Sequence, residues 1–340
     1  MEQVIKVENL KVYFQSRKKQ KDQKQADTVV RAVDDVSFFI NKGETLAVVG
    51  ESGSGKTTLG KAMINIIPAT EGKILYNGQD ITGLKGQDMQ KMRQQLQMIF
   101  QDPYESLDPR QNAYQTLREP LLIHMGDMKK EEMDQRIHQY LESVGLHPAL
   151  TMSQRYPHHL SGGQRQRLSI AATMILEPEF VVADEPVSML DVSIRAELLE
   201  LMLDLKGDKN LTYMFITHDL SLAWMIADRI AVFYLGKLME IGPAADIVHR
   251  ALHPYSKALA SVIPGTDIRA KGKERHILLG ETPSATDLPP GCRFHSRCWL
   301  YHQKGSPEVC KTREPELCPY GNGHQAACHF AKEMEKENEK

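Results

Sequence analysis

A glycine-rich octet constrains this chain more than any other feature: Gly50-Glu51-Ser52-Gly53-Ser54-Gly55-Lys56-Thr57. It follows the apolar run 45–49, and residues 58–63 can continue from it as a helix. Glycines allow the backbone to curl until several N–H groups face one anion, and a helix N-terminus adds positive potential. The pattern G-x-x-x-x-G-K-[ST] between a strand and a helix predicts a phosphate-binding loop in an α/β fold.

The residues of this loop have separate predicted roles in binding ATP. Lys56 is expected to reach the β- and γ-phosphates, and the Thr57 hydroxyl is expected to bind Mg²⁺. The other predicted phosphate contacts are Gly50, Ser52, Gly53, Gly55 and Thr58. A glycine-rich loop of chance composition is the alternative, and the flanking strand and helix argue against it.

Short apolar runs alternate with helical patterns along the first 242 residues, which is typical of a parallel sheet flanked by helices. The strand-like segments are 4–14, 30–40, 45–49, 180–183, 213–216 and 230–234. Residues 89–173 are mostly helical in pattern, and 194–205 has the spacing of an amphipathic helix. The polar run 17–25, with five basic residues, is expected to be a solvated loop, or else a contact with anionic lipid headgroups.

The apolar run 180–183 ends in two adjacent carboxylates, Asp184 and Glu185. Neighbouring side chains on an extended strand point in opposite directions, so the two can have different roles. Asp184 is predicted to hold Mg²⁺ and Glu185 to polarise the attacking water. A solvated strand end is the alternative. His218 follows the run 213–216, where ligands gather in open α/β folds, and is a candidate partner of the γ-phosphate or a structural histidine.

A second anion site is predicted in Leu160-Ser161-Gly162-Gly163-Gln164-Arg165-Gln166-Arg167, where a Ser-Gly-Gly turn opens a helix. Two phosphate-binding elements in one chain make sense if two subunits clamp the nucleotide between them, head to tail. This octet resembles the signature motif of ABC ATPases without a departure. Ser161, Gly162, Gly163 and Gln164 would then contact the ATP held by a partner subunit.

The resemblance to ABC ATPases implies roles for further residues. Tyr13 resembles the aromatic residue that stacks on adenine, and Gln101 the glutamine that binds Mg²⁺ and faces the membrane subunit. Asp191 resembles the aspartate at the subunit junction, although Met189 stands where a small residue is more usual. His218 becomes the switch histidine. A stand-alone phosphate-loop kinase does not account for the signature octet.

The same resemblance implies the domain organisation. A RecA-like core with an antiparallel β subdomain is expected over residues 1–91 and 173–242, and a helical subdomain over 92–172. Residues 243–340, rich in proline and with little periodicity, are expected to form a small Cys-rich C-terminal extension with little core of its own.

A narrower resemblance, to the ATPases of oligopeptide/dipeptide importers, rests on residues 101–110, 156–160, 253–259, 291–298 and 327–329. It implies ATP hydrolysis coupled to import, a second homologous ATPase, two transmembrane permeases and an extracellular substrate-binding protein. The chain resembles the second, F-type, ATPase of the pair, and would lie at the cytoplasmic face of the membrane. Peptides are the commonest cargo in the family, and nickel or oligosaccharides remain alternatives.

All five cysteines follow residue 291, and such a cluster favours metal binding over disulfides in a cytosolic protein. Their spacing does not choose a metal. The family resemblance implies a [4Fe–4S] cluster on Cys292, Cys298, Cys310 and Cys328, with Cys318 as the spare or alternative ligand. Reduced free thiols remain open, as does zinc, for which four histidines are also available: His295, His302, His324 and His329.

Charge and hydropathy disfavour other classes of protein. Lys and Arg number 42 against 44 Asp and Glu, a net charge of −2, so nothing favours nucleic acid as a partner, and a non-transport ABC ATPase acting on it is disfavoured. No apolar run reaches the roughly 18 residues that span a bilayer. The start Met1–Lys6 does not resemble a secretory signal. Work at a membrane would therefore require docking onto other chains.

Overall fold

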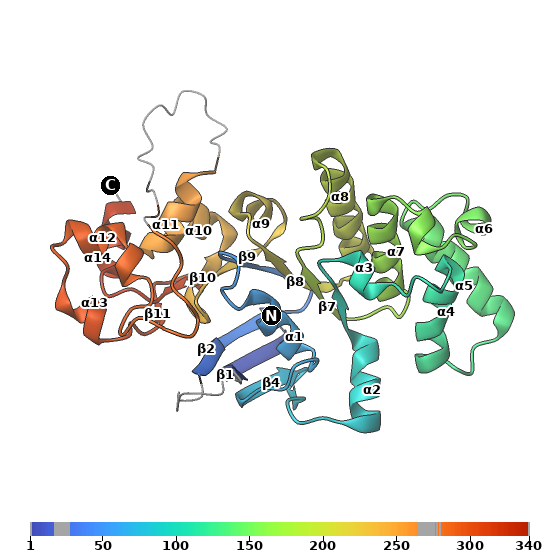
Figure 1. The fold of residues 1–340 in the computed structure, drawn as a ribbon, viewed down its shortest axis with the longest axis horizontal. Helices are drawn as coiled ribbons and strands as arrows, with labels where there is room; N and C mark the ends of the chain where they lie inside the picture. Colours follow the sequence, from blue (N-terminus) through green and yellow to red (C-terminus); the bar gives the residue numbers. More distant parts are fainter. Residues whose placement is uncertain (1, 17–27, 264–275, 277, 279, 339–340) are drawn as a thin grey trace, which may run out of the picture. The chain divides into compact units, whose positions relative to one another are not determined.

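The computed structural model describes residues 2–16, 28–263, 276, 278 and 280–338 (Figure 1). The chain forms two compact units. The first comprises Met1–Val4, Asn41–Gly43 and Gly83–Phe215, and the second comprises Ile5–Ile40, Glu44–Thr82 and Ile216–Lys340. The predicted division into 1–91 with 173–242, 92–172 and 243–340 has other boundaries and stays a prediction.

The first unit contains β6 (Leu96–Ile99), β7 (Phe180–Asp184) and most of β8 (Thr212–Thr217), which neighbour one another in the order β8-β7-β6. β6 and β7 are parallel, with Leu96 opposite Phe180 and Ile99 opposite Ala183. Every residue of β7 and β8 is buried, as expected for strands covered on both faces. The sequence-based helical prediction missed β6, because Leu, Gln and Met are strong helix formers and the strand has four residues.

Helices make up most of the first unit, as predicted for residues 89–173, and α4 to α7 gather at one end of it (Figure 1). α4 begins with a capping box, in which the side chains of Asn112 and Gln115 bind each other's backbone N–H. α8 buries Leu198, Met202 and Leu205 on one face. The helices are α2 (Gly86–Gln95), α3 (Pro103–Ser106), α4 (Ala113–His124), α5 (Lys130–Ser143), α6 (Ala149–Met152), α7 (Gly162–Met174) and α8 (Val192–Lys209).

An antiparallel sheet in the order β2-β1-β4-β5 opens the second unit, and it confirms the predicted antiparallel β subdomain. Its strands are β1 (Gln3–Ser16), β2 (Thr28–Asn41), β4 (Glu71–Tyr76) and β5 (Gln79–Asp80). The predicted loop 17–25 lies outside the described residues.

The second unit also contains neighbouring strands in the order β11-β12-β10-β9-β3. β3 pairs with β9 in parallel, whereas β10 is antiparallel to both β9 and β12. The C-terminal extension therefore adds strands to the sheet that leads into the phosphate loop. The strands are β3 (Thr45–Val49), β9 (Arg229–Tyr234), β10 (Lys237–Pro243), β11 (Cys318–Pro319) and β12 (Gln325–Ala326). The helices of this unit are α1 (Lys56–Met63), α9 (Leu220–Ile226), α10 (Ala244–His249), α11 (Pro254–Ser261), α12 (Trp299–Gln303), α13 (Glu308–Thr312) and α14 (Ala331–Asn338).

The C-terminal extension shares one apolar core with β3, β9 and β10. It was expected to have little core of its own, and its apolar side chains pack into this shared core. The rings of Tyr234, Tyr255 and Phe294 are fully buried, with centroids 5.0–5.4 Å apart. The helices here have five to eight residues, too short for a helical period to stand out from the sequence.

A buried carboxylate, Glu240 on β10, joins three parts of this unit. It accepts hydrogen bonds from the N–H groups of Leu252 (2.7 Å) and His253 (3.0 Å), and its Oε1 lies 2.7 Å from His324 Nε2. Burial lowers the pKa of His253 to about 3, so its imidazole is neutral, and Nδ1 accepts from the Tyr255 N–H at 3.1 Å. These bonds fix the start of α11 and hence the position of Tyr255.

None of the described helices combines the length and the apolar character needed to cross a membrane.

Candidate functional site

The phosphate loop, residues 50–57, connects β3 to α1 as predicted. Gly50 and Gly55 must be glycine because other backbone segments approach them closely. A Cβ atom at Gly50 would lie 2.1 Å from the carbonyl oxygen of Phe233, and one at Gly55 would lie 1.9 Å from the carbonyl oxygen of Ala32. Gly55 is also left-handed, with φ 102°, and caps α1 without a side chain. The first-turn N–H groups of α1 therefore have no capping side chain, which suits an anion.

Lys56 lies across this loop. Its Nζ donates to the carbonyl oxygens of Gly50 (2.8 Å) and Glu51 (2.9 Å), and the residue is only 5% exposed. Among the other predicted contacts, Ser52 and Gly53 are exposed, whereas Thr57 and Thr58 are half-buried. The ammonium group is thus held inside the loop by two backbone carbonyl oxygens.

Glu51, to which sequence reasoning assigned no role, is held by three residues of the C-terminal region. Arg297 donates to Glu51 Oε2 at 2.7 Å, the Thr282 hydroxyl donates to the same oxygen, and the Glu51 N–H donates to the Tyr255 hydroxyl at 3.0 Å. Burial by itself opposes ionisation, but the hydrogen bonds from Arg297 and Thr282 outweigh it and keep the pKa of Glu51 below its ordinary value. In the sequence, only the presence of an acidic residue within the phosphate loop pointed to this contact.

Tyr13 lies on β1, and its hydroxyl donates to Asp34 on β2. The guanidinium of Arg31 lies 5.7 Å from the centroid of the Tyr13 ring. Asp34 also accepts from Arg293, which donates a further hydrogen bond to the Leu235 carbonyl oxygen. Burial opposes ionisation of Asp34, yet the bonds from Tyr13 and Arg293 leave its pKa lowered. The adenine-stacking role of Tyr13 stays a prediction.

The predicted catalytic carboxylates lie in the first unit. Asp184 is the last residue of β7 and is 2% exposed, and Glu185 follows it half-buried. Gln101, just past the neighbouring strand β6, places Nε2 at 3.4 Å from Glu185 Oε2. Glu185 has φ 44°, a left-handed conformation that costs a non-glycine residue about 1–2 kcal/mol and is found preferentially at functional sites.

The signature segment opens α7. Ser161 is an exposed N-cap residue that forms a capping box with Gln164, with N–H···O distances of 3.2 and 3.0 Å. At Gly163 a Cβ would lie 2.9 Å from Ile194 Cγ2, so glycine permits the close approach of α8, whereas Gly162 is only in ordinary contact with Leu190. The helix N-terminus therefore combines a serine hydroxyl with backbone N–H groups at the surface.

Asp191 and His218 are exposed, at the start of α8 and just past β8 respectively. The loop before Asp191 is held by Arg195, a residue that the sequence did not single out: it donates to the carbonyl oxygens of Leu190 (2.6 Å) and Ser188 (3.2 Å). Met189 in this loop is 63% exposed. His218 lies in the second unit with the phosphate loop, whereas the carboxylates and signature residues lie in the first.

Four of the five cysteines belong to one apolar core or pack against it. Cys292, Cys298 and Cys310 are buried in the apolar core of the second unit, and Cys328 packs against it, whereas Cys318 is exposed on β11. Burial raises the pKa of Cys292 to about 12 and that of Cys298 to about 11. Within the described residues, no group of three or more His, Cys, Asp or Glu is placed to hold a metal ion.

The four histidines considered as zinc ligands all face oxygen atoms of the protein. His295 Nδ1 lies 2.7 Å from the Cys292 carbonyl oxygen, and His324 contacts Glu240. His302 and His329 face the carbonyl oxygens of Ser296 (3.4 Å) and Arg313 (2.9 Å). Each imidazole thus has at least one nitrogen engaged by the fold.

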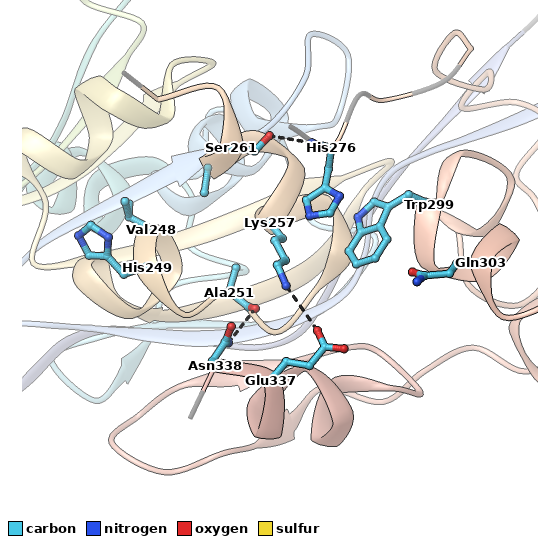
Figure 2. Close-up of a pocket in the computed structure, with 11 residues that line it drawn as sticks. Val248, His249, Ala251, Lys257, Ser261, His276, Trp299, Gln303, Glu337 and Asn338 are labelled. Carbon is cyan, nitrogen blue, oxygen red and sulfur yellow. Dashed lines mark hydrogen bonds and ion pairs between the residues drawn. The ribbon is translucent and has the colours of Figure 1, made fainter. Parts of the chain in front are cut away.

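A separate cavity of about 400 Å³ lies in the C-terminal extension (Figure 2). His276 stacks on Trp299 with ring centroids 4.1 Å apart, and Lys257 pairs with Glu337 at 3.6 Å. No residue of the phosphate loop lines it, so it is not part of the predicted nucleotide site.

Comparison with known proteins extends these observations. Residues 33–188 match the ABC transporter family, and residues 239–304 match the oligopeptide/dipeptide transporter C-terminal region. The oligopeptide transport ATP-binding protein AppF of Bacillus subtilis (strain 168) is 45% identical over 97% of this chain and 98% of its own length. The putative oligopeptide transport ATP-binding protein YkfD of the same strain is 42% identical over 98% of this chain and 97% of its own length.

Solved structures share the fold. The ATP-binding cassette MJ0796, solved as a dimer in a post-hydrolysis state with ADP and Pi, is 25% identical with a TM-score of 0.62, over 71% of this chain and 98% of that one. Similarity to AppF runs through nearly the full length of both chains, and the chain therefore belongs to the ABC transporter family, as an ATP-binding subunit of the oligopeptide/dipeptide type.

Proposed function

We propose that this chain binds ATP and hydrolyses it to ADP and phosphate to drive an importer of oligopeptides or dipeptides. The observation that carries the proposal is the match to oligopeptide transport ATP-binding proteins over 97% of the chain. The match includes the C-terminal region named for this transporter type, which here contacts the phosphate loop through Tyr255 and Arg297.

In the proposed reaction, the N–H groups of residues 50–58 and the Lys56 ammonium bind the phosphates, and Tyr13 stacks on adenine. Thr57, Gln101 and Asp184 hold Mg²⁺, which neutralises phosphate charge when bound. Glu185 accepts a hydrogen bond from the attacking water and polarises it, and His218 contacts the γ-phosphate. The hydrogen-bond contact between Gln101 and Glu185 supports a shared site for water and metal.

The exposed N-terminus of α7 supports a head-to-tail dimer. Ser161 to Gln164 would bind the ATP of a second, homologous ATPase subunit, with Asp191 at the junction, and MJ0796 was solved as a dimer. We infer a heterodimer in which this chain is the F-type member, at the cytoplasmic face of the membrane. Two permease subunits would dock near Gln101, and an extracellular substrate-binding protein would deliver the peptide.

Peptide coupling is tested with the complete transporter in proteoliposomes. Phosphate release is expected to rise when the substrate-binding protein is loaded with an oligopeptide, because cargo delivery completes the transport cycle. The same receptor incubated with a maltooligosaccharide or with Ni²⁺ serves as control. Stimulation by either of these, and not by peptide, would overturn the peptide assignment.

We also propose that the cysteine cluster holds an iron–sulfur centre. The proposal rests on the donor set alone: Cys292, Cys298, Cys310 and Cys328 contribute four thiols to one apolar core, and Cys318 is exposed. In the described residues these thiols are not already arranged to hold a metal ion, so binding would require them to move together. Burial keeps these groups as neutral thiols, and binding a [4Fe–4S] centre would require them to lose their protons to the solvent and act as thiolate ligands. The centre would stabilise the fold of the extension.

Protein purified without oxygen is expected to contain about four irons and four sulfides per chain. Cys328→Ala should lose iron, because the apolar core then offers three thiols, whereas Cys318→Ala is the matched control and should retain it. Iron, sulfide and the visible absorbance spectrum are measured together. An iron-free but folded wild-type chain, or equal loss of iron in both variants, contradicts the assignment.

A further inference from the structure

We propose that the C-terminal extension positions the phosphate loop for ATP, with Arg297 acting through Glu51 as the principal positioning residue. The proposal rests on the assignment of residues 50–57 to the ATP phosphates and assigns a task to residues outside that loop. It does not require a metal in the cysteine cluster.

Glu51 is the point of contact. Both its backbone and its side chain are engaged by the C-terminal region: the N–H donates to Tyr255, and the carboxylate accepts from Arg297 and Thr282. Its own carbonyl oxygen in turn accepts from Lys56 Nζ at 2.9 Å. The position of the Lys56 ammonium therefore depends on a residue that the extension holds.

Arg297 is held rigidly. It is 7% exposed, and its Nη1 also contacts the hydroxyls of Tyr234 (3.3 Å) and Thr282 (3.2 Å). Tyr234 belongs to the buried aromatic group with Tyr255 and Phe294. Since charge-assisted hydrogen bonds are stronger than neutral ones, a buried guanidinium of fixed position restrains Glu51 effectively.

The charge of Glu51 gives this contact a second effect. A carboxylate within a loop that binds a triphosphate repels the ligand, and the repulsion is strong where solvent is excluded. The Arg297 guanidinium offsets that charge at 2.7 Å. Without Arg297, the carboxylate would lose its arginine partner, keep the hydrogen bond from Thr282, and repel the phosphates more strongly.

A second arginine of the same segment holds the other part of the loop. Arg293 donates to the carbonyl oxygen of Leu235, and the next residue, Gly236, donates its N–H to the Ser54 carbonyl oxygen at 2.8 Å. Gly236 needs to be glycine, because a Cβ would lie 2.7 Å from the Arg31 carbonyl oxygen. Residues 293 and 297 thus restrain the loop near both Ser54 and Glu51.

The test measures the Kd of MgATP for the full-length chain. Arg297→Gln is expected to raise this Kd about tenfold or more, because it leaves a charged, half-buried Glu51 without its main partner. The double variant Glu51→Gln with Arg297→Gln should recover most of the affinity, because it removes the unpaired carboxylate as well. Arg313→Gln is the matched control: this arginine of the extension is 72% exposed and pairs only at 3.7 Å with Glu316.

In the complete transporter the same variant should raise KM for ATP with kcat nearly unchanged, because Gln101 and Glu185 are untouched. A general loss of structure would lower kcat as well. If Arg297→Gln does not fold, Arg297→Lys keeps the charge without the planar fork and should show a smaller rise in Kd.

The proposal fails if Arg297→Gln and Arg297→Lys both leave the Kd within about twofold of wild type, or if the double variant binds as weakly as the single one. Lys56→Ala, measured alongside, separates this failure from that of the loop assignment. An unchanged Kd in Lys56→Ala overturns the loop assignment itself, whereas weak binding there and normal binding in Arg297→Gln overturns only the role of the extension.

Discussion

Replacing Glu185 by glutamine is expected to slow ATP hydrolysis by about 10²–10⁴-fold, or roughly 3–5 kcal/mol of barrier, and to leave ATP binding intact. The amide has the size of the carboxylate and can keep the contact with Gln101, which lies at 3.4 Å. It lacks the negative charge that polarises water. Phosphate release by the complete transporter and the Kd of MgATP measure the two effects separately.

Glu179→Gln is the matched control for that experiment. Glu179 immediately precedes β7, at the end opposite Glu185, and pairs with Lys42 at 3.1 Å. The same chemical change there should leave turnover near its wild-type value. Near-normal turnover in Glu185→Gln would mean that another group polarises the attacking water. Gln101 would then be the next residue to replace.

Lys56→Ala is expected to raise the Kd of MgATP about 100-fold, equivalent to about 2.7 kcal/mol. Hydrogen bonds from a charged group contribute about 1.5–3 kcal/mol, and Lys56 is the ammonium held within the phosphate loop. The variant also removes the link between the carbonyl oxygens of Gly50 and Glu51, so the loop loses its internal tie. Equilibrium binding of a fluorescent ATP analogue, competed by ATP, measures the change.

Lys61 lies on the same helix, about one and a half turns after Lys56. The variant Lys61→Ala therefore serves as a control, because it also removes one positive charge from α1. Its affinity for MgATP should match that of the wild type. A change below about threefold in Lys56→Ala would contradict the assignment of residues 50–57 to the ATP phosphates.

Much of the nucleotide site was predictable because its parts are contiguous in the sequence. The phosphate loop, the carboxylate pair after β7 and the capped N-terminus of α7 each depend on the conformation of a few consecutive residues. The residue types themselves indicate that conformation. Glycine allows the close backbone approaches of the phosphate loop, and a serine three residues before a glutamine predicts the capping box of α7. The roles of these residues in catalysis remain predictions.

Strand β6 and the contact between Gln101 and Glu185 could not be derived in this way. The two residues lie 84 positions apart and meet because β6 and β7 pair in parallel, with their carboxyl ends at one edge. The sequence of β6 favours a helix as strongly as a strand. Its pairing with β7, not its composition, makes it a strand.

The C-terminal extension shows the same division most clearly. The amino-acid sequence alone shows that five cysteines gather near the end of the chain and that an acid stands in the phosphate loop. The family resemblance had already set Cys318 apart, and the structure agrees, because this residue is exposed whereas the other four lie in or against one core. The contact between Arg297 and Glu51, across 246 positions, emerged from the fold alone. The physical reason is that short-range patterns report backbone conformation, whereas the choice among many arginines and acids is made by the packing of distant segments around one core.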